Sequence, residues 1–522
     1  GSASINLALG SDYTDAGATA VDAKGRDITS SIVTANPVDV NTAGTYTVTY
    51  TTVPSGSGAF GDEFRVSEPV PTFSALDNPV VTQLLDGGFV VTWEYIDDSQ
   101  SSYAWESDII GQLYTSDGSP STRGNFRIIG SPRQMGDNSQ QSVTSLDDGG
   151  FLVTWTWRDF GGSDSRGIYG RRYDSRGIES QEGEFQINTG SSGSPEDSSV
   201  ASLADGGFVV IWRGVGQGYT SPGRTGDIIS GRRYASDGSP QGDEFQINTF
   251  ERVANDLTTP SVTALKDGGF VATWAKQLMD EETGLAMVLI GQRFAPNGAA
   301  LGGEFTIINT RTNGVWDYGG SITSTSVTSL NDGGFVVALE SCNDDPAGVC
   351  SVLGQRLASD GSPSGNRFQV AASMGDVSQD ADSSQRRPSV TSLNDGGFVV
   401  TWESDDYSRN VDSDTGIYGQ RFAPDGTLQG SWFQINTETR GGHEKPSVTA
   451  LTGDGFLVAW SSIFNVPPTL SSGRSAISAQ RFSSAYNAGA TQVTRTVVVA
   501  DYVPEAPYVI SLRGSASVGL EL

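Results

Sequence analysis

The sequence has few of the residues on which common enzyme centres and metal sites depend. Its 522 residues include one histidine, His443, two cysteines and four methionines. A single histidine excludes His-based catalytic triads and leaves little room for a His-rich metal centre. A metal site built on the two cysteines alone would lack further soft ligands, since none cluster near them in the sequence.

Basic residues and long apolar runs are also scarce. Lysine and arginine total 32 against 61 acidic residues, which gives a net charge of −29. A chain this acidic lacks the basic footprint that nucleic acids and anionic membranes require, so we expect neither as a partner. No apolar run is long enough to cross a bilayer, so we expect no membrane span in this segment. The many carboxylates suit an extracellular module and Ca²⁺, which prefers clustered oxygen ligands.

What the sequence does contain is a unit that occurs seven times. A segment reading LxDGGFVVTW is followed by a variable polar stretch, then by GQRFxxDG and by GxxFQIN. The phenylalanine of the first segment recurs at intervals of 57 to 65 residues, at Phe89, Phe151, Phe208, Phe270, Phe335, Phe398 and Phe456. A period of this size indicates a repeat architecture such as a β-propeller.

Each unit has the composition of four short strands. Glycine-rich turns separate runs of β-branched and aromatic residues, and no stretch keeps a period of 3.6 residues. We therefore expect an all-β protein whose main domain is a seven-bladed β-propeller with four-stranded blades. The tryptophan of FVVTW is expected in the core, and the turn aspartates are expected to be turn formers. The third-strand arginine is expected to satisfy a partner between blades.

The fourth strands predict how the ring closes. They fall at Phe126, Phe185, Phe245, Phe305, Phe368 and Phe433, and the seventh unit has none after Phe482. A matching segment, Gly61–Val66, lies ahead of the first full unit. An N-terminal strand that completes the last blade would remove an exposed sheet edge, so we expect this closure.

The two flanks resemble parts of one bacterial immunoglobulin-like repeat. Residues 13–32 and 44–51 match its early strands, and residues 487–500 match its last strand. The propeller is thus expected to be inserted in an Ig-like β-sandwich, since loop tips tolerate insertions whose ends lie close together. We expect the Ig-like domain to comprise residues 1–55 and 484–502, and the propeller to comprise residues 56–483. Residues 503–522 are expected to form a linker and the start of a next repeat, because residues 514–522 resemble the N-terminus.

Cys342 and Cys350 flank a short loop in the fifth unit. Their spacing favours a local disulfide, which would imply an oxidising compartment. Two free thiols in a loop are the alternative.

The repeat also predicts where a ligand would bind. Connections between strands two and three, and between blades, are long and variable, and in a propeller they project from one face, where binding residues concentrate. Aromatic candidates outside the repeat pattern are Tyr103, Trp105, Trp157, Tyr219, Trp316, Tyr318 and Tyr407. Acidic candidates for Ca²⁺ are Asp97, Asp98, Asp344, Asp345, Asp405, Asp406, Asp412 and Asp414. Aromatic rings stack on sugars or anchor peptide side chains; local packing and solvated acidic loops are the alternatives.

The propeller units and the Ig-like flanks together resemble modules of large calcium-dependent RTX-type adhesins of Gram-negative bacteria. The resemblance implies an extracellular, monomeric, non-enzymatic adhesion module that binds a cell-surface glycan or protein of a host or neighbouring cell, with adjacent Ig-like repeats forming a stalk. Where that family often has DNVDGDIT, this chain has Asp22 to Asp27 reading DAKGRD, which leaves a metal site there in doubt. A polysaccharide-acting glycosidase or lyase and an inert spacer are the alternatives.

Overall fold

The structure is a computed structural model. It describes residues 4–8, 19–20, 32–35, 38, 44–52, 63–68, 70, 74–97, 106–129, 136–159, 166–189, 192–216, 227–249, 257–280, 284–309, 311–312, 315–316, 321–342, 349–370, 384–405, 415–438, 441–452, 455–464, 474–483, 492–500 and 520–521. Every regular element in these ranges is a β-strand. The chain forms two compact units, one from residues 1–59 and 482–522 and one from residues 60–481.

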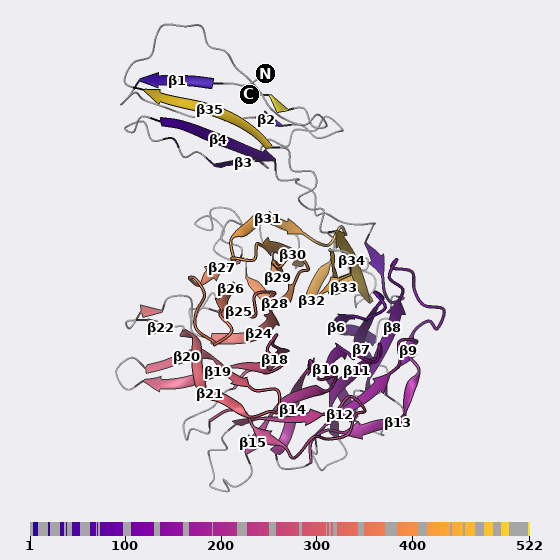
Figure 1. The fold of residues 1–522 in the computed structure, drawn as a ribbon. Helices are drawn as coiled ribbons and strands as arrows, with labels where there is room; N and C mark the ends of the chain where they lie inside the picture. The colour runs from indigo at the N-terminus through magenta and orange to yellow at the C-terminus, as the bar shows by residue number, and fades with distance from the viewer. Residues whose placement is uncertain are drawn as a thin grey trace. The chain divides into compact units, whose positions relative to one another are not determined.

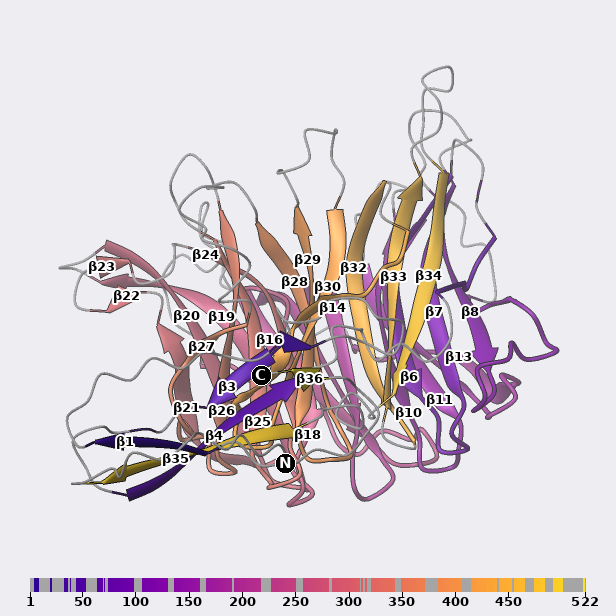
Figure 2. The same ribbon diagram turned by 90° about the horizontal axis from the view of Figure 1, so that it is seen from above.

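The larger unit is a seven-bladed β-propeller, as the repeat predicts. Each blade is a four-stranded antiparallel sheet. In Figure 1 the sheets are arranged in a ring with the first strand of each blade nearest the centre. Figure 2 shows the strands of the later blades, β28 to β34, running side by side through the thickness of the ring.

The strands of the first four blades follow the chain order. Blade 1 has β6 (Ser74–Gln83), β7 (Phe89–Asp97), β8 (Glu106–Tyr114) and β9 (Phe126–Arg127). Blade 2 has β10 (Gly136–Ser145), β11 (Phe151–Asp159), β12 (Arg166–Tyr173) and β13 (Glu179–Gln186). Blade 3 has β14 (Ser192–Ser202), β15 (Phe208–Gly216), β16 (Asp227–Tyr234) and β17 (Phe245–Gln246). Blade 4 has β18 (Ser261–Ala264), β19 (Phe270–Asp280), β20 (Gly284–Phe294) and β21 (Ala300–Asn309).

A two-stranded hairpin precedes the last three blades, and only the seventh blade departs from the chain order. The hairpin is β22 (Arg311–Thr312) with β23 (Val315–Trp316). Blade 5 has β24 (Ser321–Ser329), β25 (Phe335–Cys342), β26 (Cys350–Leu357) and β27 (Phe368–Gln369). Blade 6 has β28 (Gln385–Ser392), β29 (Phe398–Asp405), β30 (Thr415–Phe422) and β31 (Leu428–Gln434). Blade 7 has β32 (Gly442–Leu451), β33 (Gly455–Phe464), β34 (Arg474–Ser483) and β5 (Phe64–Arg65).

The ring closes through β5, as predicted. Phe64 and Arg65 pair with Ala479 and Ser478 of β34, so an N-terminal strand is the outermost strand of the last blade. Glu63, just ahead of this strand, accepts hydrogen bonds from the backbone N–H (2.7 Å) and hydroxyl (2.8 Å) of Thr437 in blade 6. The closing strand is therefore bonded both within its own blade and to the preceding one.

Aromatic rings explain why the repeat keeps its phenylalanines. Within blade 6, Phe398 of the FVVTW strand stacks on Phe422 of the third strand with ring centroids 4.7 Å apart. The fourth-strand phenylalanine of the preceding blade, Phe368, tilts onto this pair at 6.2 Å from Phe398 and 4.9 Å from Phe422. The third-strand glycine makes room for this ring, since a Cβ at Gly354 would lie 2.4 Å from Phe368. The motif therefore forms the contact between blades.

The expected core tryptophans are buried. Each is at most 1% exposed: Trp93, Trp155, Trp212, Trp274, Trp402 and Trp460. Leu339, which replaces tryptophan in blade 5, is also fully buried.

Hydroxyl side chains of the first strands link neighbouring blades around the centre. The Ser389 hydroxyl in blade 6 accepts the backbone N–H of Val448 in blade 7 at 3.2 Å. The Ser447 hydroxyl in blade 7 accepts the N–H of Val81 in blade 1 at 3.1 Å, across the closure of the ring. Because the first strand of each sheet has a free edge, these hydroxyls satisfy N–H groups that no strand pairs with.

The smaller unit contains a four-stranded sheet in the order β1 (Ser4–Ala8), β35 (Gln492–Ala500), β4 (Gly44–Thr52) and β3 (Ile32–Ala35). β35 runs parallel to β1 and antiparallel to β4. A strand that follows the propeller in sequence thus lies between two strands that precede it. The unit also contains β2 (Thr19–Ala20) paired with β36 (Leu520–Glu521).

Candidate ligand-binding face

The two ends of the propeller differ in chemistry. Antiparallel pairing places the DGG turns and the turns between strands three and four at one end, which we call the turn face. The connections between strands two and three and between blades begin and end at the opposite end, which we call the loop face.

Residues of the turn face repeat from blade to blade and satisfy one another. In blade 6, the Asp395 carboxylate accepts the N–H of Gly397 at 2.9 Å and pairs with Arg421 at 2.8 Å. Equivalent ion pairs are Arg172–Asp148, Arg233–Asp205, Arg293–Asp267 and Arg356–Asp332. The expectation that this arginine partners another blade is therefore wrong for these five ion pairs, which lie within one blade because the third strand ends beside the DGG turn of its own sheet. It is confirmed for Arg481 of blade 7, which donates to the backbone carbonyl of Ser116 in blade 1 at 2.9 Å.

The same arginines still act between blades through their position. Hydrogen bonds from Thr427 lower the pKa of Asp425 in the second turn of blade 6, and the charge of Arg356 in blade 5 lowers it further. A Cβ at Gly426 of that turn would lie 2.9 Å from the Arg356 side chain. The turn aspartates are turn formers, as expected. The charged side chains of the turn face are bonded to one another.

The first strands change conformation as they approach the loop face. Five of them contain a β-bulge at the same point, two or three residues before the Val of the SVTSL motif. The residue in the left-handed region of this bulge is not glycine, and φ lies between 47° and 58° at Asn78, Gln140, Asp197, Arg387 and Lys445. Bulges re-aim side chains and tend to occur next to functional sites.

Buried glutamates hold three of these bulges in place. The N–H of Gln140 is bonded to Glu94 at 2.6 Å, and that of Lys445 to Glu403 at 2.8 Å. The N–H of Arg387 is bonded to Glu340 at 2.9 Å. In each pair the carboxylate belongs to the preceding blade, and the three glutamates are only 3 to 6% exposed. A buried carboxylate costs stability unless it is bonded, so these groups and the bulges stabilise one another.

One charge cluster lies on blades 6 and 7. The Arg387 guanidinium is 3.0 Å from Glu403 and 3.4 Å from Glu444, and its side chain is 44% exposed. These carboxylates raise the pKa of Arg387 despite its partial desolvation. Burial raises the pKa of Glu403, and this effect outweighs the opposing attraction of Arg387. Lys445 pairs with Asp77 of blade 1 across the closure.

A second cluster lies on blades 2 and 3. Arg213 pairs with Glu196 at 2.6 Å and with Asp197 at 2.9 Å, and Arg166 of blade 2 pairs with Glu196. The nearby carboxylates raise the pKa of Arg213 against the effect of burial. Each charge here has a partner of opposite sign, so the cluster is a structural network.

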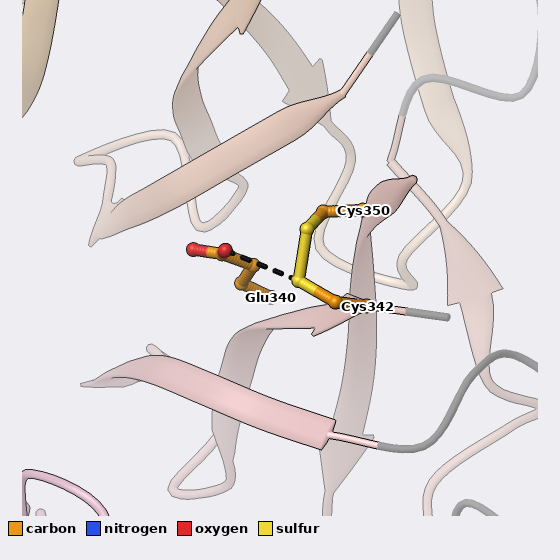
Figure 3. A group of neighbouring side chains, drawn as sticks. All are labelled: Glu340, Cys342 and Cys350. Carbon is orange, nitrogen blue, oxygen red and sulfur yellow. Dashed lines mark hydrogen bonds between the residues drawn. A yellow bond between two sulfur atoms is a disulfide. The ribbon is translucent and has the colours of Figure 1, made fainter. Parts of the chain in front are cut away.

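The structure joins Cys342 and Cys350 in a disulfide (Figure 3). The two residues are directly opposite each other on β25 and β26. Glu340 lies beside them, and these three groups offer ligand atoms within 4.8 Å of one another. Both sulfurs are consumed by the disulfide, so this is not a metal centre. The 3.4 Å approach of Cys342 Sγ to Glu340 is a contact, because a disulfide sulfur has no proton to donate.

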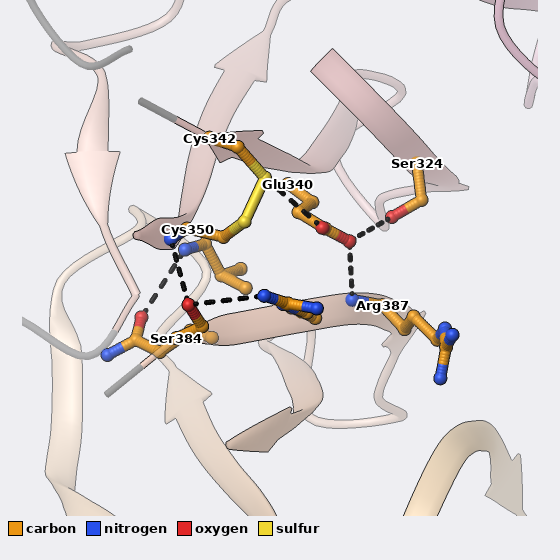
Figure 4. Close-up of a disulfide and its surroundings, with 9 residues drawn as sticks. Ser324, Glu340, Cys342, Cys350, Ser384 and Arg387 are labelled. Atoms are coloured by element: carbon orange, nitrogen blue, oxygen red, sulfur yellow. Dashed lines mark hydrogen bonds between the residues drawn. A yellow bond between two sulfur atoms is a disulfide. The ribbon is translucent and has the colours of Figure 1, made fainter. Parts of the chain in front are cut away.

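The disulfide adjoins the interface between blades 5 and 6. The N–H of Cys350 donates to the Ser384 hydroxyl at 3.2 Å, and Glu340 accepts from the Ser324 hydroxyl at 3.1 Å. Figure 4 shows the Arg387 N–H meeting Glu340 while its guanidinium points away from that glutamate. Glu340 thus contacts both the disulfide and the bulge that carries Arg387.

The structure places few of the predicted site residues. Trp157 is half-buried and packs edge-on against Tyr169 with centroids 6.1 Å apart, beside the core between blades 1 and 2. Asp97, Asp405 and Trp316 are the last residues of β7, β29 and β23. The other candidates lie outside the described residues: Asp98, Tyr103, Trp105, Tyr219, Tyr318, Asp344, Asp345, Asp406, Tyr407, Asp412 and Asp414.

The bulge residues were not predicted from the sequence. Arg387, Lys445 and Asn78 each stand directly before a proline, two residues ahead of the residue that opens the repeated first-strand motif. A bulky polar residue before proline at a fixed offset in three units is a signal that could have identified them.

One comparison with known proteins bears on the smaller unit. A family model described as the Ig-like domain of bacterial surface proteins matches residues 1–59. This match supports a surface or extracellular protein. A comparison with curated protein sequences gives no significant match. No helix in the described part of the chain is long and apolar enough to cross a membrane.

Solved structures similar to this chain are distant propellers or proteins of unknown function. A polysaccharide lyase, Uly1, has a TM-score of 0.48 at 10% identity over 78% of this chain and 90% of its own. An α-L-arabinanase from Penicillium chrysogenum has 0.44 at 13%, over 66% and 92%. A protein of unknown function from Dyadobacter fermentans has 0.43 at 12%, over 81% and 99%. Likeness at this level carries no argument about activity.

Proposed function

We propose that this chain is a non-enzymatic ligand-binding module of a large surface adhesin of the RTX type from a Gram-negative bacterium. Its propeller binds a glycan or protein on the surface of a host or neighbouring cell through the loop face. The Ig-like unit is split by the propeller and joins adjacent Ig-like repeats of a stalk. The module acts as a monomer outside the cell, and Ca²⁺ supports its structure or its binding.

The contrast between the two faces is the observation that carries this proposal. Side chains at the turn face are bonded to one another in repeated pairs, which leaves them little capacity for a ligand. The loop end of the first strands has a different residue in every bulge, and two of these side chains, Gln140 and Arg387, are exposed. Variable groups on a rigid ring are typical of binding surfaces. The surface-type Ig-like match and the interposed strand β35 fit a module displayed from a stalk.

A glycan array probed with the full chain, with and without EDTA, tests this function. We expect binding to a subset of glycans and weaker binding after EDTA treatment. Binding to no glycan under either condition would leave a protein ligand or an inert spacer. Individually weak contacts would suffice in a cell, because many adhesin copies bind together.

A polysaccharide-acting glycosidase or lyase is the second candidate, and Glu403 is the observation that favours it. A buried carboxylate with a raised pKa is the form that a general acid takes, and Glu403 lies beside Arg387 toward the loop face. A reducing-end assay on the polysaccharides bound in the array decides between the two. Turnover that is lost in Glu403→Gln would establish the enzyme, and binding without turnover supports the adhesin.

A further inference from the structure

Glu340, Cys342 and Cys350 lie close together at the loop end of blade 5, and we call them the Glu–Cys group. The two cysteines are directly opposite each other on β25 and β26, with Cα atoms 3.9 Å apart. Glu340 precedes Cys342 by two residues on β25, so both side chains point to the same face of the sheet. Figure 3 shows the three side chains together, and their ligand atoms all lie within 4.8 Å of one another.

The two carboxylate oxygens of Glu340 have different surroundings. Oε2 accepts hydrogen bonds from the Ser324 hydroxyl at 3.1 Å and the backbone N–H of Arg387 at 2.9 Å. Oε1 lies 3.4 Å from Cys342 Sγ and has no hydrogen-bond donor among the described residues. Glu340 is 6% exposed, and a buried carboxylate costs stability unless donors or a cation meet it. In the oxidised chain one oxygen of this carboxylate is therefore directed at a sulfur that cannot donate.

Reduction changes the chemistry of the Glu–Cys group. A dithiol reductant gives two electrons and two protons to the disulfide, becomes a disulfide itself, and leaves Cys342 and Cys350 as thiols. Two sulfurs that can ionise and one carboxylate oxygen then lie around one point. The cytosol, in which a surface protein is synthesised, keeps thiols reduced, so the chain exists in this state before the disulfide forms.

The ligand types and their spacing suit Zn²⁺. Thiolate and carboxylate are both zinc ligands, and Zn–S bonds of about 2.3 Å at a tetrahedral angle hold two sulfurs about 3.8 Å apart. Parallel side chains on Cα atoms 3.9 Å apart match this separation. Thiolates favour Zn²⁺ over Ca²⁺ and Mg²⁺, which prefer oxygen ligands. Cys350 and Glu340 are buried and Cys342 is half-buried, so an ion would enter past Cys342.

We propose that the reduced Glu–Cys group binds Zn²⁺ through Cys342 Sγ, Cys350 Sγ and Glu340 Oε1, with water as the fourth ligand. This site goes beyond the proposed function. Binding releases the two thiol protons and brings a cation to Glu340 Oε1. When a disulfide oxidant takes two electrons from the two thiolates and is itself reduced to two thiolates, the Cys342–Cys350 bond forms and Zn²⁺ leaves. The ion and the disulfide thus cross-link the same strand ends in alternate redox states.

Co²⁺ replaces Zn²⁺ as an optical probe of this site in the full chain. The chain is reduced with dithiothreitol, separated from the reagent under argon and titrated with Co²⁺, whose thiolate complexes absorb in the near ultraviolet. We expect this absorption to saturate at one Co²⁺ per chain, to disappear when Zn²⁺ is added and to persist in excess Ca²⁺. The oxidised chain should not show it. A reduced chain without thiolate absorption would overturn the inference.

A matched pair of variants tests the carboxylate ligand. Loss of a residue that only bonds to a metal ligand already weakens metal affinity about 10–100-fold, so Glu340→Gln, which keeps both thiols, should weaken Co²⁺ binding at least tenfold. Glu94→Gln is the control and should leave the affinity unchanged. Glu94 has the same place in blade 1, is 3% exposed and bonds to the bulge of blade 2, but lies in a blade without cysteine. Equal affinities of Glu340→Gln and the wild type would overturn the three-ligand site.

The exchange between ion and disulfide is measured on the wild type, so the inference can be tested even if a variant does not fold. The reduced chain loaded with Zn²⁺ is treated with oxidised glutathione. A weak chromophoric chelator reports the released Zn²⁺, and a thiol assay counts the remaining thiols. We expect one Zn²⁺ to be released for every two thiols lost. Zn²⁺ that stays bound after the thiols are oxidised would show that it binds elsewhere and would overturn the inference.

Discussion

Each first strand of the propeller is paired on one side only, so some of its backbone N–H groups depend on acceptors outside its own sheet. Serine and threonine of the SVTSL motif supply them from the preceding blade, as Ser142 does for Val200 at 3.3 Å. The motif therefore has two functions, since its Val and Leu are buried and its hydroxyls link the blades. A buried N–H without an acceptor costs about 1–3 kcal/mol.

Removing one hydroxyl should have a measurable cost. Ser389→Ala leaves the N–H of Val448 without its acceptor, so the free energy of unfolding should fall by about 1–2 kcal/mol in urea titration. Ser116→Ala, at an exposed turn, should change it by less than about 0.5 kcal/mol. Equal effects of the two substitutions would contradict the linking role.

Glu403 should make stability depend on pH in a direction opposite to that of most carboxylates. Burial raises its pKa in the folded protein above the usual 4.5, although Arg387 opposes this shift. Its contribution to stability is therefore complete below the unfolded-state pKa and is lost as the pH rises through the folded-state value. The wild type should thus gain stability relative to Glu403→Gln as the pH falls from 7 toward 4.5. A difference that stays constant across this range would show that burial does not control this group.

At the scale of strands and loops, a disulfide cross-links the second and third strands at the loop end of blade 5. It joins residues eight apart in sequence on paired strands. Beside it, Glu340 bonds to the bulge of blade 6 that carries Arg387. The end of one hairpin is thus connected to the neighbouring blade.

Reduction should destabilise the protein to an extent set by the short loop. A loop of this length corresponds to about 2–3 kcal/mol of chain entropy in the unfolded state. We expect a lower melting temperature in dithiothreitol, and no effect of dithiothreitol on the Cys342→Ser/Cys350→Ser variant. A melting temperature that is the same with and without reductant in the wild type would argue against the bond in solution.

The closing strand should matter more than its two residues suggest. Phe64 packs 5.5 Å from Tyr114 of blade 1, so Phe64→Ala removes a contact across the closure. We expect a loss of about 2–4 kcal/mol and faster hydrogen exchange in β34 than in the strands of blade 4. Phe245→Ala, at the equivalent place in blade 3, is the matched control, and faster exchange in β34 in that variant would contradict a specific closing role.

At the scale of the whole molecule, the ring provides seven similar positions, and the chain varies the residues of the loop face more than those of the turn face. Ion pairs of the same kind in blades 2 to 6 keep the turn face fixed, so variation on the loop face need not disturb the fold. The split of the smaller unit's strands between the two ends of the chain requires only that the ends of the ring lie close together, which β5 ensures.

A bound Ca²⁺ ion would stabilise the folded chain as a whole, so its effect is measured on the unfolding of the whole molecule. If Ca²⁺ binds the folded protein as proposed, EDTA should lower the melting temperature, and Ca²⁺ at a hundred times its dissociation constant should restore about 2.7 kcal/mol. Mg²⁺ at the same concentration is the control. A melting curve that EDTA does not move would remove Ca²⁺ from the proposal.

The periodic residues were sufficient to predict the architecture. Phe398, Trp402 and the DGG turns recur because every blade must pack on the next in the same way. The number of blades and the closure by the segment Gly61–Val66 could therefore be predicted from the amino-acid sequence alone. The bulge residues could not be predicted in this way. Arg387 and Gln140 differ in residue type, and the backbone N–H of each is bonded to a glutamate of the preceding blade, a contact that only the packed ring creates.

The sequence by itself determined the all-β class, the seven blades, the buried tryptophans and the strand that closes the ring, because each depends on local pattern repeated at a fixed period. Only the tertiary structure decided that five of the third-strand arginines pair within their own blades and that buried glutamates hold the bulges of the next blade. These contacts join residues some 25 to 50 positions apart, and which carboxylate meets which N–H depends on how adjacent sheets are oriented. That orientation is a property of the closed ring and is not encoded in any one repeat.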